Sequence, residues 1–261
     1  MTSPLLELDS VTKRFGRVVI AEDLSLAIGP GDVVGIVGPN GAGKTSLFGL
    51  ISGDLAPGAG EIRFAGRTIT KLDAAARCRL GIGRTYQVPR PFGDMTVFEN
   101  LLVAAQQGGG LRRRASYAAA VGALERTGMA AHANVPAERL GLLQRKRLEL
   151  ARALATQPTL LLLDEVAGGL TDPEVAQLVE IVRGVNAEGT AVIWIEHVVR
   201  ALTAVVSRLI CLSGGKFVGD GEPATVLAEP AVREVFLGSE VTASLSGGTL
   251  TTKAGAPGDT P

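Results

Sequence analysis

The sequence lacks the features that mark several classes of protein. Its two cysteines, Cys78 and Cys211, show no CxxC or other metal-binding spacing, which argues against a disulfide scaffold and a cysteine-based zinc site. No basic start leads into an apolar stretch, so we expect no secretory signal. No window approaches the roughly 20 consecutive apolar residues that a membrane-spanning helix needs. We therefore expect an intracellular protein with reduced thiols, which reaches a membrane only through other chains.

An excess of charge is also missing. Twenty-six basic residues balance 26 acidic ones, so the formal net charge is zero. We therefore expect no general attraction to nucleic acid or to acidic lipid. The 261 residues are 46% hydrophobic and 20% charged, which is typical of a globular protein with a sizeable core. The length favours one domain that carries a subdomain.

Short apolar runs alternate with helical stretches along most of the chain. Runs such as DVVGIVG, TLLLLDE and TAVIWIE have the composition of strands, and their order predicts an α/β core formed by residues 1–86 and 158–238. Strand-like runs are missing from residues 87–157, which predicts an inserted helical subdomain with helices at 97–107, 116–128 and 143–157. Residues 239–261 are rich in Ser, Thr, Gly and Pro and predict a disordered tail.

A glycine-rich segment, GPNGAGKTS, follows the first fully apolar strand and precedes a helical pattern. It has the G-x-x-x-x-G-K-[ST] spacing in the strand-to-helix context that a phosphate-binding loop requires. Its backbone N–H groups can surround an anion, Lys44 would reach the β- and γ-phosphates, and the Thr45 hydroxyl would bind Mg²⁺. The predicted nucleotide-binding residues of this segment are Gly38, Pro39, Asn40, Gly41, Ala42, Gly43, Lys44, Thr45 and Ser46.

A second signal is LLLLDE, an apolar strand that ends in two acidic residues. Ligands of open α/β sheets bind at the carboxyl ends of the strands, where Asp164 and Glu165 would lie. Asp164 is suited to hold Mg²⁺ of a nucleotide, and Glu165 is suited to act as a general base that polarises the attacking water.

Taken together, these segments resemble the ATP-binding-cassette (ABC) ATPases over residues 5–238. The resemblance extends to RTYQVPRPF, WIEH and KRFG, which contain Gln87, His197 and Phe15. It implies a P-loop NTPase fold of the ABC ATPase type, with a mixed sheet and an inserted helical subdomain. It further implies that Gln87 reaches the metal and the attacking water, that His197 contacts the γ-phosphate as a catalytic aid, and that Phe15 stacks on adenine.

Within the family, the sequence is most similar to the ATP-binding subunits of branched-chain amino acid importers. The segments that carry this likeness are QVPRPFGDMTVFENLLVAA, DEVAGGLTDPEV, EHVVRAL and GEPATVLAEPAVREVFLG. It implies a peripheral protein at the cytoplasmic face of the membrane, bound to permease subunits and served indirectly by an extracytoplasmic solute-binding protein. From its position after Gln87, we expect the segment 89–95 to lie near the membrane subunit. Subunits that serve urea, amides or lipopolysaccharide share much of the pattern, so the solute stays open.

One departure from the family pattern lies at residues 141–143. The signature motif of the family has Ser-Gly-Gly there and grips the γ-phosphate bound to a partner chain, whereas this sequence has Gly141, Leu142 and Leu143. Loss of the charge-assisted hydrogen bond from the serine hydroxyl would cost roughly 1.5–3 kcal/mol. Thr171 also stands where the family commonly has Asp or Asn. We expect pairing with a second, different ATP-binding subunit; the alternative is a homodimer that tolerates these changes.

Two further functional readings follow from the same residues. A soluble ABC ATPase of DNA repair or translation would usually carry a second cassette or a long inserted module, which this chain lacks. A regulatory module that binds nucleotide without fast hydrolysis is favoured by the altered signature and opposed by the presence of Glu165 and His197.

Overall fold

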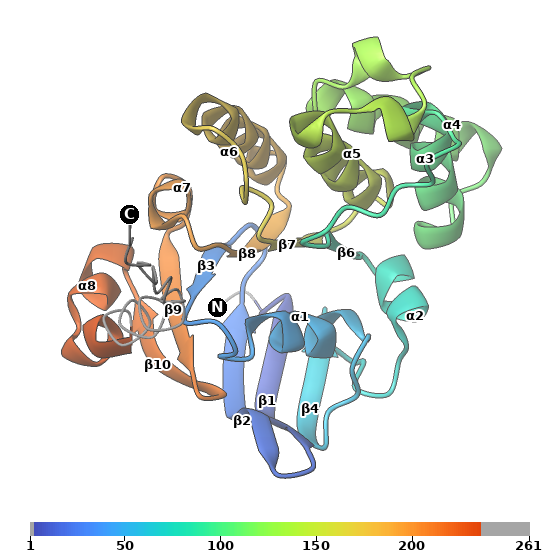
Figure 1. Cartoon of the computed structure of the whole chain (residues 1–261). Helices are drawn as coiled ribbons and strands as arrows, with labels where there is room; N and C mark the ends of the chain where they lie inside the picture. The colour runs from blue at the N-terminus through green and yellow to red at the C-terminus, as the bar shows by residue number, and fades with distance from the viewer. Residues whose placement is uncertain (1–2, 236–261) are drawn as a thin grey trace, which may run out of the picture.

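A six-stranded sheet forms the centre of the fold in the computed structural model, which describes residues 3–235 (Figure 1). Its strand order is β10-β9-β3-β8-β7-β6, and β10 is the one strand that runs antiparallel to its neighbour. The strands are β3 (Val33–Val37), β6 (Ile82–Arg84), β7 (Leu160–Asp164), β8 (Ala191–Ile195), β9 (Arg208–Ser213) and β10 (Lys216–Gly221). The α/β class with a mixed sheet, predicted from the sequence, is confirmed.

The three central strands are buried at every residue. β3, β7 and β8 read VVGIV, LLLLD and AVIWI, and none of their residues is exposed. A parallel strand that is covered on both faces needs apolar side chains in both directions, which produces such uninterrupted runs. This is why the sequence alone predicts these three strands.

A second, antiparallel sheet has the order β2-β1-β4-β5 and packs below the central sheet (Figure 1). Its strands are β1 (Leu6–Phe15), β2 (Val18–Ile28), β4 (Ala59–Phe64) and β5 (Arg67–Thr68). Helix α1 (Lys44–Ser52) shares a hydrophobic core with this sheet through Leu47, Phe48, Leu50 and Ile51. This core supports the helix that follows the glycine-rich loop.

The helical segments between β6 and β7 gather on one side of the central sheet (Figure 1). They include α3 (Val97–Val103), which continues as a π-helix over Ala104–Gly108, then α4 (Arg113–Arg126) and α5 (Leu142–Ala155). All three predicted helices of this part of the chain are present. The sequence-based bounds differ by a few residues, and the π-helical turn accounts for the end of the first one.

The remaining helices follow the core strands. They are α2 (Ala74–Arg79), α6 (Asp172–Ala187), α7 (Val199–Thr203) and α8 (Pro223–Ala228). No helix within residues 3–235 combines the length and apolarity that a bilayer crossing requires. The predicted tail at 239–261 lies outside the described residues.

The order of strands in the central sheet determines where the candidate site residues meet. β3 and β7 both pair with β8 in parallel, so the three strands end at one edge of the sheet. The glycine-rich loop follows β3, Glu165 follows β7, and His197 comes two residues after β8. Segments far apart in the sequence therefore meet at a single edge.

Candidate nucleotide site at the ends of the central strands

The loop that joins β3 to α1 requires glycine at two positions. Gly38 has φ 151° and Gly43 has φ 103°, in the region that other residues rarely adopt. A Cβ atom at Gly38 would overlap the carbonyl oxygen of Leu212, and one at Gly43 would overlap the carbonyl oxygen of Ile20. The loop therefore packs tightly on its own scaffold and leaves its backbone N–H groups close to any bound anion.

Lys44, the first residue of α1, is held against this loop. Its Nζ donates hydrogen bonds to the carbonyl oxygens of Gly38 at 2.8 Å and Pro39 at 3.0 Å. Burial lowers the pKa of the ammonium group, and the carboxylates of Glu165 and Asp164 oppose that shift. The cation thus lies beside the start of a helix, where an anion is favoured.

The side chain of Glu165 lies between Gln87 and His197, the two residues to which the family resemblance assigns catalytic roles. Gln87 Nε2 donates to Glu165 Oε2 at 2.5 Å, and His197 Nε2 lies 2.6 Å from Glu165 Oε1. Each carboxylate oxygen therefore has one partner. The three predicted catalytic residues form one cluster, although they come from three separate parts of the chain.

The backbone of Glu165 has an uncommon conformation. Its φ of 48° is in the left-handed region, which costs a residue with a Cβ of the order of 1 kcal/mol or more. Two contacts support it: the N–H of Glu165 donates to the carbonyl of Ile195 at 2.9 Å, and the carbonyl accepts from Lys146 Nζ at 3.2 Å. Strain held in place at this position aims the carboxylate into the site.

Asp164, the last residue of β7, is only 1% exposed. Its Oδ2 accepts from Arg84 Nη2 at 3.2 Å, and its backbone N–H donates to Thr85 Oγ1 at 3.1 Å. Burial raises the pKa of the Asp164 carboxyl, and the neighbouring guanidinium of Arg84 opposes that shift.

The other oxygen of Asp164 bears on whether a metal fits here. Oδ1 is buried and has no hydrogen-bond partner among the described residues. Such groups are rare because an unpaired buried acceptor is costly. A hard cation such as Mg²⁺, with water in its coordination shell, would satisfy this oxygen. The residues present therefore fit a magnesium site.

A cavity of about 600 Å³ opens above these residues. Its lining includes most of the predicted site: Asn40, Gly41, Ala42, Gly43, Lys44, Thr45, Ser46, Gln87, Glu165 and His197, together with Ile20. Gly38, Pro39 and Asp164 do not line it: the carbonyl oxygens of Gly38 and Pro39 accept from Lys44 Nζ, and Asp164 is buried. The size and the polar walls suit the phosphates of a nucleotide.

Phe15 does not line this cavity, and neither does Lys13, which contacts the Phe15 ring. Phe15 ends β1, is 53% exposed, and carries Lys13 Nζ 5.2 Å above its ring. The cavity lining found within residues 3–235 does not include it. Its contact with adenine stays a prediction.

The altered signature begins helix α5 and does not line the cavity either. Gly141 is the residue before the first helical turn and caps it with no side chain. Leu142 is 49% exposed, and its Cδ2 lies 3.3 Å from where a Cβ of Gly169 would be. The first residue of α5 thus presents an apolar, half-exposed side chain.

The sequence reasoning missed three polar residues that hold the site together. Lys146, 5% exposed, donates to the carbonyls of Gln87 at 3.0 Å and Glu165 at 3.2 Å. Glu196, 2% exposed, accepts from the N–H groups of Ala167 at 2.5 Å and His197 at 3.1 Å. Arg84 is the third. Of the three, Glu196 alone had a signal in the sequence: it is a charged residue directly after an apolar strand, in WIEH.

Comparisons with known proteins agree with this geometry. A sequence model of the ABC transporter family matches residues 21–168. The high-affinity branched-chain amino acid transport ATP-binding protein LivG of Escherichia coli strain K12 is 34% identical over 253 residues, which cover 91% of this chain and 99% of LivG. The lipopolysaccharide export system ATP-binding protein LptB of Acidithiobacillus ferridurans is 32% identical over 240 residues, which cover 91% of this chain and 98% of LptB.

A solved structure is similar over the same extent. The ADP conformation of MJ1267, an ATP-binding cassette of an ABC transporter, superposes with a TM-score of 0.83. It is 28% identical in sequence, and the match covers 91% of this chain and all of MJ1267. The similarity therefore includes the central sheet, the site at its edge and the helical segments.

Proposed function

Since the chain belongs to the ABC transporter family of ATPases, we propose that its ATP hydrolysis energises an importer whose solute is a branched-chain amino acid. The observation that carries this proposal is the similarity to LivG, which spans 99% of that protein and thus leaves no region of it unmatched at domain scale. The similar identity to LptB supports the same ATPase role with a different cargo. The solute is therefore the part of the proposal that needs a direct test.

The test is a transport measurement in cells that make the chain. Removal of its gene is expected to abolish uptake of radiolabelled leucine, isoleucine and valine, and the wild-type gene is expected to restore it. A matched Glu165→Gln gene should fail to restore uptake while the protein accumulates normally. Unchanged uptake of all three amino acids in the deletion strain would contradict the proposed solute.

The residues of the site suggest how ATP would be hydrolysed. The loop N–H groups and Lys44 would bind the phosphates, and Mg²⁺, which neutralises phosphate charge, would be held by Thr45, Asp164 and Gln87. Glu165 would accept a proton from the attacking water. His197, 2.6 Å from Glu165 Oε1, would orient that carboxylate and contact the γ-phosphate.

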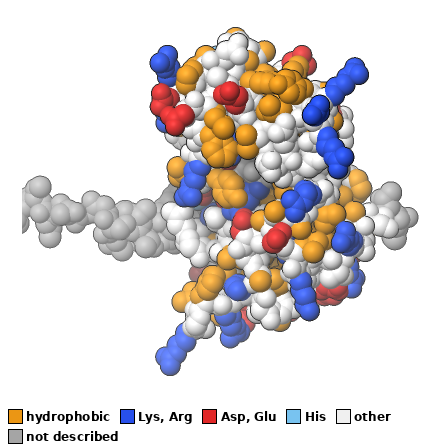
Figure 2. All heavy atoms as spheres, turned by 90° about the vertical axis from the view of Figure 1, so that its right-hand side faces the viewer, with side chains coloured by type: hydrophobic (Ala, Val, Ile, Leu, Met, Phe, Trp, Pro, Cys, Tyr) orange, Lys and Arg blue, Asp and Glu red, His pale blue; other side chains and the backbone are white. Residues whose placement is uncertain are grey.

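We also propose that the segment 89–95 contacts a membrane subunit at the cytoplasmic face. Its neighbourhood exposes large apolar side chains, of which Val88 is 66% and Phe92 48% exposed. Figure 2 shows the side of the molecule that lies on the right in Figure 1. Hydrophobic side chains gather there beside the hollow between its upper and lower parts. Exposed apolar groups of this kind are common at protein interfaces. Single cysteines at 89–95 are expected to crosslink to the permease, whereas crosslinks only from a cysteine at Arg233 would count against this contact.

Finally, we propose that the nucleotide-bound dimer pairs this chain with a second, different ATP-binding subunit. Gly141 offers no hydroxyl, and the exposed Leu142 side chain stands at the start of α5, where a phosphate would have to approach closely. The phosphate-binding loop, Glu165 and His197 of this chain would complete a working site with the signature of the other subunit. The opposite site, lined by Leu142 and Leu143, would turn over slowly.

A further inference from the structure

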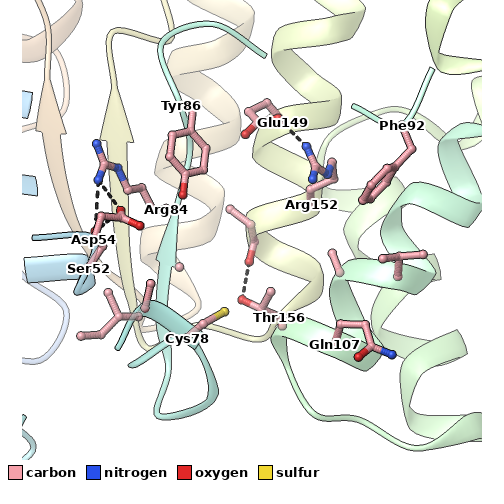
Figure 3. A pocket seen from close by; sticks show the side chains of 17 residues that line it. Ser52, Asp54, Cys78, Arg84, Tyr86, Phe92, Gln107, Glu149, Arg152 and Thr156 are labelled. Atoms are coloured by element: carbon pink, nitrogen blue, oxygen red, sulfur yellow. Dashed lines mark hydrogen bonds and ion pairs between the residues drawn. The ribbon is translucent and has the colours of Figure 1, made fainter. Parts of the chain in front are cut away.

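A second cavity, of about 270 Å³, lies between the core and the helical segments (Figure 3). Arg84 and Asp54 stand on one side of it and Arg152 with Glu149 on the other. Arg84 differs from the other charged residues of this groove because it also contacts a residue of the candidate nucleotide site. The groove and the site thus share one side chain.

The guanidinium of Arg84 connects two carboxylates that belong to different places. Nη1 lies 2.8 Å from Asp54 Oδ2 and 3.1 Å from Ser52 Oγ at the groove. Nη2 lies 3.2 Å from Asp164 Oδ2. The Arg84 side chain is 9% exposed, against 37% for Asp54 and 2% for Asp164, so the connection runs from solvent towards the interior.

Aromatic rings restrict the guanidinium further. Its central carbon lies 5.1 Å from the centre of the Tyr86 ring and 5.8 Å from that of Phe48. A guanidinium that lies over two rings and binds two carboxylates has little freedom to rotate. The position of Nη2 beside Asp164 is therefore fixed by Ser52, Asp54 and Tyr86 of the groove, together with Phe48 of α1.

The residues that follow Arg84 in the sequence contact Asp164 and the residue after it, Glu165. Thr85 Oγ1 accepts from the N–H of Asp164, and Gln87 Nε2 donates to Glu165. Arg84, Thr85 and Gln87 therefore contact the last residue of β7 and the residue that follows it. A displacement of residues 84–87 would therefore change the hydrogen bonds of both the Asp164 and the Glu165 carboxylates.

We propose that Arg84 is a positioning residue for the metal site. It binds Oδ2 of Asp164 and leaves Oδ1, which has no partner among residues 3–235, available to the coordination shell of the metal. Asp54 holds Arg84 in that position from the groove. This inference rests on the proposed use of Asp164 in a Mg²⁺–nucleotide site.

The experiment compares nucleotide binding with and without the metal in the purified full chain. The affinity for a fluorescent ATP analogue is measured in Mg²⁺ and in EDTA, and the ratio of the two gives the gain from the metal. Arg84→Met is expected to reduce this gain about tenfold, the size of one lost charge-assisted hydrogen bond, while the affinity in EDTA stays unchanged. Arg84→Lys, which keeps the charge but not the fork, should lie between.

Two further variants separate positioning from general damage. Asp54→Asn, which weakens the anchor of Arg84 without contacting the site, should reduce the gain in the same direction. Arg152→Met is the matched control: Arg152 lies over the ring of Phe92 and pairs with Glu149 in the same groove, and its loss should leave the gain unchanged.

Several outcomes would overturn the inference. One is an Arg84→Met protein with the wild-type gain from Mg²⁺. Another is an equal loss of affinity in Mg²⁺ and in EDTA, which indicates a structural role alone. If Arg84→Met does not fold, Arg84→Lys and Asp54→Asn decide by the same ratio. A wild-type chain that gains nothing from Mg²⁺ would instead contradict the proposed function itself.

Discussion

Nε2 of His197 lies 2.6 Å from Oε1 of Glu165, and the side-chain amide of Gln87 binds the other oxygen of that carboxylate. These residues follow β6, β7 and β8, and they meet because these three strands are parallel neighbours. A carboxylate held on both oxygens has a fixed direction. That arrangement suits a group that must take a proton from one particular water molecule.

The first prediction concerns Glu165→Gln. The amide keeps the shape of the side chain and can still bond to Gln87 and His197, but it cannot accept a proton from water. The rate of phosphate release is expected to fall by about 10²–10⁴-fold, with ATP affinity unchanged. An unchanged rate would favour the reading of a nucleotide-binding regulatory module.

The second prediction concerns the altered signature. Replacement of Gly141, Leu142 and Leu143 by Ser-Gly-Gly restores a hydroxyl at the start of α5 and removes the exposed Leu142 side chain. Nucleotide affinity at the site that this segment faces is expected to rise about tenfold, and ATP turnover of the assembled pair should rise with it. If the pair that contains the Ser-Gly-Gly variant and the pair that contains the natural chain hydrolyse ATP at equal rates, Gly141, Leu142 and Leu143 have no functional cost.

The third prediction concerns Glu196, which ties the loop after β7 to the loop after β8. Glu196→Ala would leave the N–H groups of Ala167 and His197 without this acceptor. The free energy of unfolding is expected to fall by about 1–3 kcal/mol, and ATP hydrolysis should fall too because His197 is no longer held. Glu180→Ala, at an exposed position of α6, is the matched control and should change neither quantity.

The fourth prediction concerns Arg77, a buried arginine of α2 whose guanidinium lies at the end of α1. It donates to the carbonyls of Leu50, Ile51, Thr70 and Leu72, and two of these end the helix that follows the phosphate-binding loop. Arg77→Met is expected to lower the free energy of unfolding by about 3 kcal/mol because several buried carbonyls lose their donor. Chemical denaturation checks this, and the exposed neighbour Arg79→Met should remain close to wild type.

The elements that were predictable from sequence are those whose environment is uniform. β3, β7 and β8 are apolar at every position but one because both faces are covered, and the glycine-rich loop has a local spacing that allows few alternatives. β2 escaped detection because charged and apolar residues mix along it, with Asp23 at φ 54° where its pairing with β1 changes register. β6 is only three residues long.

Within the candidate site too, only residues that belong to a local sequence pattern could be predicted from that pattern. Asp164 and Glu165 are recognisable because they end an apolar run, whereas Gln87 and His197 came only from the family resemblance. Arg84 is 80 residues from Asp164, and Lys146 is 59 residues from Gln87. Contacts over such separations depend on strand order and on the placement of α5, which no local pattern encodes.

We propose that this chain supplies one working half-site and needs a second ATP-binding subunit to close on ATP. The most direct measurement is the mass of purified Glu165→Gln protein by light scattering, with and without ATP and Mg²⁺. We predict a monomer that binds ATP, and an ATP-dependent dimer only when Ser-Gly-Gly also replaces residues 141–143. An ATP-dependent dimer of the Glu165→Gln protein with its own Gly141, Leu142 and Leu143 would contradict the need for a second, different subunit.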